Sequence, residues 1–390
     1  MKNFPHQIND IPKLVAALAV YQDLLQKSCD VTDDDVFGYA MAEALVYQFR
    51  NQKDKSPEAI AARIATEKTK SASNQGARTA ARDIRRFFEL ANFATATSIT
   101  KIGENILEAG SDVGNPIVCH LWHNAMMRIS IPPTKVGYEG HSHPYRVLLK
   151  LVEVRPSIPK DRMALALEAE DDTDEEFERI LSIADESNWY DLIDSSESMR
   201  KNAVKILPAI ARQIGDITDA GLKKKKQIIQ PDKQRREAEE EQDKLTTVSD
   251  ISPIDYPQEF SYAGKPKAKQ EAILRSGQKV QPRDRLVAVR ALMHANHLCE
   301  GDPDHPTFIR RSDNKPYTEP HHLIPLAFSD NFDVSLDVEE NIVSLCSTCH
   351  NLIHYGKDAA QLIKKLYMQR GELLRQVGLE LTLEELLKMY

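Results

Sequence analysis

Residues 319–326, EPHHLIPL, and residues 340–354, ENIVSLCSTCHNLIH, decide the fold of the C-terminal part of this chain. The first stretch, together with Tyr317 and Thr318 before it, predicts a β-strand over residues 317–326 that contains two consecutive histidines. The second contains a C-x2-C pair and an H-x3-H pair at the start of a helix, which we expect to continue through AAQLIKKLYMQR at 359–370. Cysteines and histidines so closely spaced indicate a small unit organised around bound metal.

One set of these residues predicts a structural zinc site. Cys346 and Cys349 are separated by two residues, as in a tight turn, and Cys299 with His305 supplies the other two corners of a tetrahedron. Zinc binding at such a site stabilises the fold of a segment that has little hydrophobic core of its own. The choice of ligands is not unique, because His297 is a rival to His305.

A second set of residues indicates a catalytic centre. Its members are His321, His322, Asn341, His350 and His354. Because His350 and His354 lie four residues apart on a helix, both imidazoles can reach one cation. Adjacent residues on a strand point to opposite sides, so one histidine of the 321–322 pair can face the cation and the other the substrate.

Residues 290–356 resemble the HNH (ββα-metal) nuclease domain of restriction and McrA-like endonucleases. The resemblance rests on HPTF at 305–308, EPHHLIPL, FDVSLDVEENIVSLC at 332–346 and the CxxCHxxxH run at 346–354. It implies that His321, His350 and His354 hold one catalytic divalent cation, Mg²⁺ or Mn²⁺. It also implies that His322 is the general base and that Asn341 holds the loop and orients that base.

The mechanism that this resemblance implies is hydrolysis of a DNA phosphodiester. Neutral His322 would take a proton from the attacking water, while the cation stabilises charge on the phosphate and on the departing 3′ oxygen. The products would carry 5′ phosphates. The alternative that all these histidines serve structural zinc in a noncatalytic module does not explain Asn341 or the surplus of histidines.

Three functions agree with this pattern. The first is a site-specific, type II-like restriction endonuclease acting on double-stranded DNA. We expect it to cut both strands as a homodimer on a palindromic site, or else by successive nicking as a monomer. The second is a modification-dependent, methylcytosine-specific endonuclease, against which an aromatic content of 6% argues because a flipped base needs an aromatic pocket. The third is a noncatalytic, zinc-containing DNA-binding regulator.

The charge distribution permits DNA as the partner. The net charge is −8, but residues 161–200 alone contribute −11, which leaves +3 for the remainder. Residues 265–290 contain eight Lys or Arg residues, and we expect Lys279, Arg283 and Arg285 among them to contact phosphates. The alternative is a solvated flank.

The first 110 residues predict helices, of which residues 76–90, GARTAARDIRRFFEL, are the clearest amphipathic segment. Its apolar residues share one face, and the basic residues around the others are Arg78, Arg82, Arg85 and Arg86. The polar stretch ATATSITKIG at 94–103 follows it. This order is typical of a winged helix whose basic helix reads DNA, although an arginine-rich surface helix of a bundle would look the same.

We therefore expect a multidomain, mainly α protein with α+β parts. The expected units are a helical or winged-helix DNA-recognition domain (1–110), a second helical or winged-helix-like unit with an acidic segment (111–220), a charged connector (221–260) and an HNH nuclease domain with structural zinc (261–390). No apolar run approaches the roughly 20 residues of a membrane helix, and the N-terminal stretch is a poor secretory signal, so we expect a cytoplasmic protein.

Overall fold

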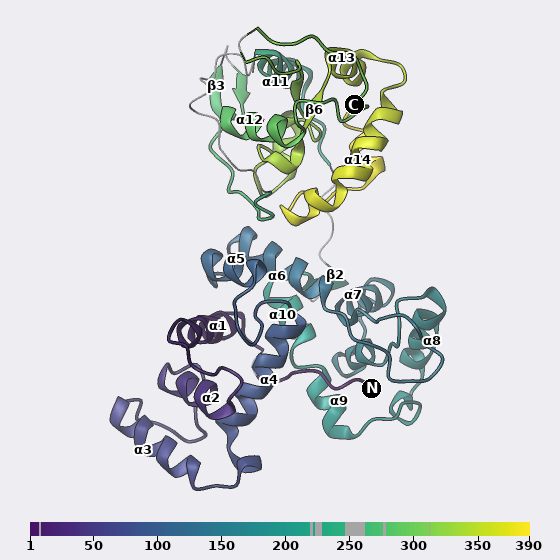
Figure 1. Cartoon of the computed structure of the whole chain (residues 1–390). Helices are drawn as coiled ribbons and strands as arrows, with labels where there is room; N and C mark the ends of the chain where they lie inside the picture. Colours follow the sequence, from purple (N-terminus) through teal and green to yellow (C-terminus); the bar gives the residue numbers. More distant parts are fainter. Residues whose placement is uncertain (8, 219–220, 223–227, 246–261, 276–277, 312) are drawn as a thin grey trace. The chain divides into compact units, whose positions relative to one another are not determined.

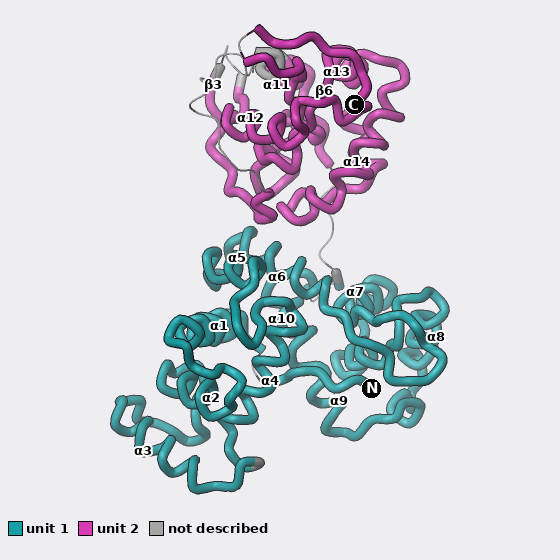
Figure 2. Tube along the Cα trace, viewed as in Figure 1, with its two compact units in different colours: residues 1–224 teal, residues 225–390 magenta. Residues whose placement is uncertain are grey.

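The structure is a computed structural model that describes residues 1–390 except 8, 219–220, 223–227, 246–261, 276–277 and 312. The chain divides into two compact units, residues 1–224 and 225–390, which Figure 2 colours separately. In the part of the chain that the structure describes, no helix is both long and apolar enough to cross a membrane.

Among the described residues of unit 1, residues 1–224, helices predominate over strands (Figure 1). Its α-helices are α1 (Ile11–Gln26), α2 (Asp34–Glu43), α3 (Pro57–Lys68), α4 (Gly76–Leu90), α5 (Lys101–Ala109), α6 (Pro116–Arg128), α7 (Pro144–Val154), α8 (Asp174–Asp185), α9 (Glu197–Ala203) and α10 (Leu207–Gln213). Short 3₁₀ helices are η1 (Ala72–Asn74), η2 (Lys160–Leu167) and η3 (Trp189–Asp191), and β1 (Ile217–Thr218) pairs antiparallel with β2 (Gly221–Leu222).

Local sequence signals explain where several of these helices begin. The side chains of Asp10, Ser56 and Thr173 each accept a hydrogen bond from the first turn of the helix that follows, α1, α3 and α8 respectively. A side chain at this position satisfies a backbone N–H that has no partner within the helix. Proline in the first turn of α1 and α3 fits there because it needs no hydrogen-bonded N–H.

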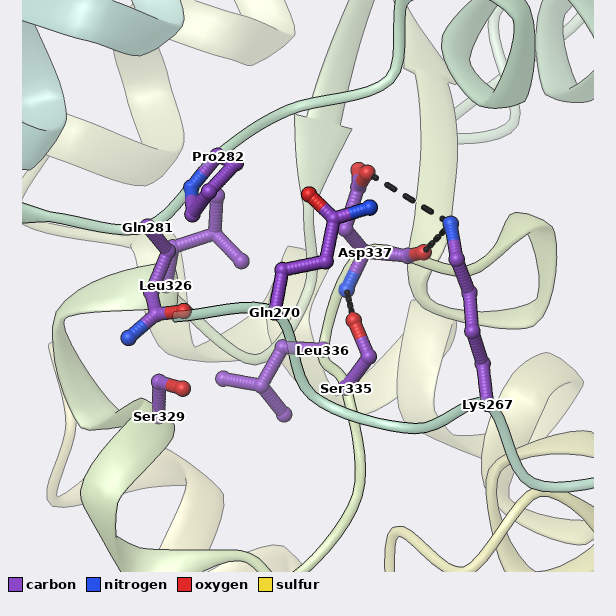
Figure 3. A pocket seen from close by; sticks show the side chains of 9 residues that line it. All are labelled: Lys267, Gln270, Gln281, Pro282, Leu326, Ser329, Ser335, Leu336 and Asp337. Atoms are coloured by element: carbon purple, nitrogen blue, oxygen red, sulfur yellow. Dashed lines mark hydrogen bonds and ion pairs between the residues drawn. The ribbon is translucent and has the colours of Figure 1, made fainter. Parts of the chain in front are cut away.

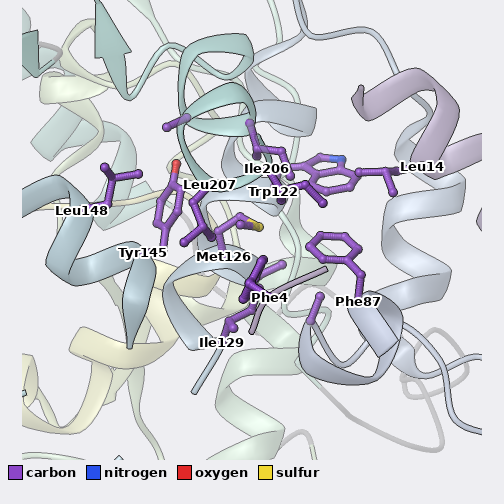
Figure 4. Packing of buried hydrophobic residues seen from close by; sticks show 14 of the residues in the cluster. Phe4, Leu14, Phe87, Trp122, Met126, Ile129, Tyr145, Leu148, Ile206 and Leu207 are labelled. Atoms are coloured by element: carbon purple, nitrogen blue, oxygen red, sulfur yellow. The ribbon is translucent and has the colours of Figure 1, made fainter. Parts of the chain in front are cut away.

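One hydrophobic cluster runs through most of unit 1. Trp122 of α6 stacks on Phe87 of α4, with ring centroids 6.3 Å apart (Figure 4). The ring of Phe93 meets the same indole edge-on. The cluster includes buried residues from 4 to 217. Residues 1–110 and 111–220 thus share one core inside one compact unit, and a domain boundary near residue 110 stays a prediction.

The segment expected as a winged helix contains α4, a turn and α5. The turn is closed by a single antiparallel bridge between Ala94 and Ile99, and Thr100 caps α5 by accepting a hydrogen bond from the N–H of Gly103. The winged-helix assignment stays a prediction, because many tight turns contain a single bridge of this kind.

Unit 2, residues 225–390, contains both quoted motifs. Its α-helices are α11 (Lys233–Leu245), α12 (Arg285–His294), α13 (Ser347–Tyr355), α14 (Ala359–Gln376) and α15 (Leu383–Leu387), and its 3₁₀ helices are η6 (Leu326–Asn331) and η7 (Glu339–Asn341). Its strands are β3 (Ile273–Arg275), β4 (Gln278–Val280), β5 (Glu319–His322) and β6 (Ile342–Leu345). β3 pairs antiparallel with β4, and β5 pairs antiparallel with β6.

The pair β5–β6 and the helix α13 form the framework of the site. The register places His321 opposite Val343 and His322 opposite Ile342, and α13 begins two residues after β6 ends. All four residues of β6 are buried, and α12 packs on this pair of strands. The predicted strand around residues 317–326 is shorter in the structure, where β5 covers only Glu319–His322.

The helix predicted to continue from His350 through residue 370 is interrupted, so this prediction is wrong. α13 ends at Tyr355 and α14 begins at Ala359. Gly356 lies between them in an extended conformation, where a Cβ atom would be 2.6 Å from the carbonyl oxygen of Leu352. Glycine permits this close approach, and the chain changes direction there.

Part of the predicted connector belongs to unit 2. In α11 the guanidinium of Arg236 donates to the carbonyl oxygen of Met389, and Glu239 accepts a hydrogen bond from the N–H of Gln281. Residues 233–245 thus form a helix with contacts inside unit 2, and the role of residues 221–260 as a connector stays a prediction. Residues 223–227 and 246–260 of the expected connector lie outside the described residues.

Candidate metal centres and active site

Cys299, His305, Cys346 and Cys349 converge at the start of α13. The Nδ1 atom of His305 lies 3.8 Å from the sulfur of Cys299, 3.6 Å from that of Cys346 and 3.2 Å from that of Cys349. Ligands about 2.0–2.3 Å from a tetrahedral Zn²⁺ are separated from each other by roughly 3.3–3.8 Å. The cluster therefore has the dimensions and donor atoms of a zinc site.

The surroundings of Cys299 agree with a bound thiolate, whereas burial and the neighbouring cysteine sulfurs raise the pKa of the Cys349 thiol. Burial opposes ionisation of Cys299, but hydrogen bonds from the backbone at Cys346 and Asp302 and from the His305 side chain lower the pKa of its thiol to about 7. The sulfur of Cys346 caps α13 by accepting from the N–H of Cys349. Gly301 lies against the cluster, where a Cβ atom would be 3.0 Å from the sulfur of Cys349.

The rival ligand His297 lies elsewhere. It is buried, and its Nδ1 atom is 3.4 Å from the guanidinium of Arg310, which also pairs with Asp313. Burial lowers the pKa of His297 to about 4, with the charges of Arg310 and Lys315 acting in the same direction. The structure thus groups His305, not His297, with the three cysteines.

A second cluster consists of His321 on β5 with His350 and His354 on α13. One nitrogen of each ring lies within 4.8 Å of the others, and the Nε2 atoms of His350 and His354 are 3.3 Å apart. His321 and His350 are buried. Three imidazoles converging on one point suit a divalent cation that keeps further positions for water or a phosphate oxygen.

Two other side chains form hydrogen bonds with ring nitrogens of His350 and His321. The Nδ1 atom of His350 hydrogen-bonds with the carboxylate of Glu319, which also accepts from the hydroxyl of Ser347. The Nε2 atom of His321 lies 2.9 Å from the hydroxyl of Tyr390. Contacts of this kind orient a metal-binding histidine and select the nitrogen that it presents to the metal.

His322 contacts a different set of groups from His321, as alternation along a strand predicts. Its Nε2 atom lies 3.2 Å from a carboxylate oxygen of Asp337, and both side chains are buried. Burial raises the pKa of Asp337, but His322, the N–H of Asp284 and Lys267 outweigh it and hold that pKa below its usual value. An ionised Asp337 can orient the His322 ring and support positive charge on it.

Asp337 also lines a small pocket, shown in Figure 3. The ammonium of Lys267 is 3.2 Å from the carbonyl oxygen of Asp337 and 3.9 Å from its carboxylate, and Gln270 and Gln281 contribute side-chain amides nearby. The pocket therefore presents polar groups beside the carboxylate that contacts His322.

Asn341 is fully buried, and its side chain forms hydrogen bonds with the main chain of the segment between β5 and β6. Its amide nitrogen donates to the carbonyl oxygens of Ile324 and Leu336, at 3.0 and 2.9 Å, and its side-chain oxygen accepts from the N–H of Ile324 at 2.8 Å. Ile324 is two residues from His322, so these bonds fix the backbone that carries this histidine. This geometry matches the loop-holding part of the role expected for Asn341.

The basic residues expected to contact DNA have varied surroundings. The side chain of Arg283 is 8% exposed and pairs with Glu239 of α11 at 3.1 Å, whereas Lys279 on β4 is exposed. Arg285 begins α12 and is also exposed. DNA contact by Lys279, Arg283 and Arg285 stays a prediction, and the pairing of Arg283 gives that residue a role inside unit 2.

The arginines of α4 bind neighbouring parts of unit 1. Arg78 pairs with Asp35, while Arg82 and Arg85 both pair with Asp34 of α2. Arg86 donates to the carbonyl oxygen of Asn3. Their role in reading DNA stays a prediction, and Arg82, whose side chain is 58% exposed, is the most accessible of the three that pair with α2.

Sequence reasoning did not single out Glu319, Asp337 or Tyr390. Glu319 and Asp337 lie inside the quoted motifs, and an acidic residue two positions before His321 was a signal that could have been used. Nothing in the sequence connects Tyr390 with His321, because 69 residues separate them.

Two neighbouring Cys/His clusters on a strand–strand–helix unit make this part of the chain compatible with a metal-dependent nuclease domain. The chain is 36% identical over 96 residues to the type IV methyl-directed restriction enzyme EcoKMcrA of Escherichia coli (strain K12). The match covers 25% of this chain and 32%, about a third, of that protein. No family model matches the chain. This chain is therefore similar to part of a restriction enzyme.

Proposed function

We propose that this protein is a restriction endonuclease that hydrolyses phosphodiester bonds of duplex DNA by an HNH mechanism. The observation that carries the proposal is that the two adjacent histidines of β5 contact different groups. His321 joins His350 and His354 in a cluster that suits a cation, while the adjacent His322 contacts a buried carboxylate. A structural metal site alone does not require His322, Asp337 or Asn341 in this arrangement.

In this mechanism His322 accepts the proton of the attacking water. Asp337 holds the ring by its Nε2 atom, which leaves Nδ1 as the basic nitrogen, and stabilises the imidazolium that forms. Asn341 keeps the backbone beside His322 in place. A divalent cation, Mg²⁺ or Mn²⁺, held by His321, His350 and His354, would supply charge stabilisation for the phosphate and the departing 3′ oxygen.

The first candidate is site-specific cleavage of unmodified DNA by a homodimer on a palindromic site. A second candidate, cleavage dependent on modified cytosine, is favoured by a specific observation: the relative described above is named methyl-directed. Because the match covers about a third of that protein, we keep both candidates for the test below.

The deciding experiment incubates the purified protein with unmodified and cytosine-methylated plasmid in Mg²⁺ or Mn²⁺, followed by sequencing of fragment ends. Discrete fragments with 5′ phosphates from unmodified DNA support the first candidate. Cleavage confined to methylated plasmid supports the second. Binding of DNA without cleavage of either plasmid would contradict both and support a zinc-containing regulator.

His322→Ala tests the assignment of the base. We expect it to abolish cleavage without unfolding the domain, while DNA binding and zinc content remain as in the wild type. The matched control is His141→Ala, which removes an exposed histidine from unit 1. Cleavage retained by His322→Ala would contradict the proposed base.

A further inference from the structure

The hydroxyl of Tyr390 lies between a histidine of the second cluster and the main chain. It is 2.9 Å from the Nε2 atom of His321 and donates to the carbonyl oxygen of Leu323 at 2.8 Å. The ring planes of Tyr390 and His321 are tilted by 37°, with centroids 6.1 Å apart. The contact is therefore made through the hydroxyl group and not by stacking of the rings.

The number of protons in this contact defines the tautomer of His321. A tyrosine hydroxyl has one hydrogen, and here it is directed to a carbonyl oxygen, which can only accept. Towards His321 the hydroxyl oxygen must then accept, so Nε2 carries the hydrogen of the neutral imidazole. The lone pair of His321 is consequently on Nδ1, the nitrogen left for a metal ion.

We propose that Tyr390 is a positioning residue for metal binding: it holds His321 as the Nε2–H tautomer and presents Nδ1 to the divalent cation. This inference rests on the metal site of the proposed function and deepens it. Glu319 has the equivalent relation to His350, where the carboxylate contacts Nδ1 and leaves Nε2 beside the Nε2 atom of His354. Two ligands from different elements are thus oriented by groups outside the cluster.

The end of unit 2 holds Tyr390 in this place. The preceding residue, Met389, is fully buried, and its carbonyl oxygen accepts from Arg236 of α11 at 2.8 Å. The carbonyl of Lys388 accepts from Gln230, and Thr382 with Glu385 forms a capping box that starts α15. Main-chain contacts of this kind remain when the tyrosine hydroxyl is removed. Tyr390→Phe should therefore remove the contacts of the hydroxyl with His321 and with the carbonyl oxygen of Leu323 and change little else.

The first test measures binding of Mn²⁺ to the zinc-loaded full-length protein, by the loss of the electron paramagnetic resonance signal of free Mn²⁺. Removal of a group that orients a metal ligand weakens metal binding by about 10- to 100-fold. We therefore expect Tyr390→Phe to raise the Kd for Mn²⁺ at least about tenfold, with zinc content and thermal unfolding as in the wild type.

The matched control is Tyr367→Phe. The Tyr367 hydroxyl donates to the carbonyl oxygen of Leu381 at 2.7 Å, so this variant also removes one tyrosine–carbonyl bond from the C-terminal segment but leaves His321 untouched. We expect its affinity for Mn²⁺ to equal that of the wild type. Equal affinity of Tyr390→Phe and Tyr367→Phe would overturn the proposal.

The second test detects the tautomer directly. In protein labelled with ¹⁵N-histidine and free of Mn²⁺, two-bond ¹H–¹⁵N couplings distinguish the two neutral forms, and the His321 signals are those missing in His321→Ala. We expect the Nε2–H form in the wild type and a mixture in Tyr390→Phe. An Nδ1–H form of His321 in the wild type would contradict the proposal.

These experiments separate the failure of this inference from the failure of the proposed function. If the wild type binds Mn²⁺ and His321→Ala weakens that binding but Tyr390→Phe does not, only the role of Tyr390 is wrong. If the wild type binds no Mn²⁺, or His321→Ala binds it equally well, the metal site and the proposal for Tyr390 both fail.

Discussion

The Nε2 atom of His322 lies 3.2 Å from the Oδ1 atom of Asp337, and the Oδ2 atom of the same carboxylate accepts from the N–H of Asp284 at 2.7 Å. Both carboxylate oxygens therefore have defined partners in a buried environment. The contact places a negative charge beside the proposed base, on a residue 15 positions further along the chain.

Asp337→Asn should impair cleavage without preventing DNA binding. The amide has only one accepting oxygen, so it cannot serve both His322 and the N–H of Asp284, and it carries no charge to stabilise an imidazolium. Because general-base catalysis contributes about 10²–10⁴-fold, we expect kcat to fall by at least about tenfold. The control is Asp330→Asn, which removes the partner of Arg235 and lies outside both clusters. An unchanged kcat for Asp337→Asn would remove Asp337 from the mechanism.

Asn341→Ala should destabilise unit 2. The substitution removes three hydrogen bonds and leaves the buried N–H and carbonyl of Ile324 and the carbonyl of Leu336 without this partner. The loss of buried hydrogen bonds costs about 1–3 kcal/mol for each stranded group, so we expect the free energy of unfolding to fall by about 3 kcal/mol. Denaturant titration measures this. Asn351→Ala, which removes one exposed bond to the carbonyl of Ser347, should change it by well under 1 kcal/mol.

Cys346→Ser should remove zinc and, with it, cleavage. Serine is a poor zinc ligand, and the cluster would retain only three ligand side chains. We expect elemental analysis to find zinc in the wild type and little in this variant, and thermal unfolding of unit 2 to shift to lower temperature. Cys29→Ser serves as the control, because Cys29 lies in unit 1 outside either cluster. Full zinc content in Cys346→Ser would contradict the ligand set.

Unit 2 should lose stability in mild acid through His297. The pKa of His297 is lowered by burial to about 4 in the folded protein, against about 6.5 in the unfolded chain. The unfolded state therefore binds more protons below pH 6.5, so this contribution to stability is present above pH 6.5 and is lost as the pH falls towards 4. A shift of this size corresponds to about 3 kcal/mol at most.

The check is the pH dependence of urea unfolding in the wild type and in His297→Asn. Asparagine suits this position because the backbone there has a φ of 54°, in the left-handed region that asparagine tolerates. The variant should show a smaller decrease in unfolding free energy between pH 7 and pH 5. Equal slopes in the two proteins would mean that another group controls the acid sensitivity.

The parts of the site that could be predicted from the sequence depend on short-range spacing. The C-x2-C pair, the H-x3-H pair and the two faces of β5 follow from helix and strand geometry, and the structure brings His321, His350 and His354 together as expected. The ion pairs of the α4 arginines with Asp34 and Asp35, the docking of α11 and the contact of Tyr390 with His321 join residues far apart in sequence. Periodicity carries no information about such contacts. The break between α13 and α14 at Gly356 could not be predicted either, because it depends on the close approach of Gly356 to the carbonyl oxygen of Leu352.

The helix α13 carries ligands of both clusters, with Cys349 and His350 adjacent in the chain. Under the proposed function, a newly made chain that has not yet taken up zinc would lack the metal ion that holds the first turn of this helix, and His350 and His354 would not be aligned with His321. The ability to cut DNA would then be acquired only after zinc loading, and oxidation of the cysteines would remove it. Zinc supply and thiol redox state would in this way set when, during the life of the protein, the host's own DNA is exposed to it.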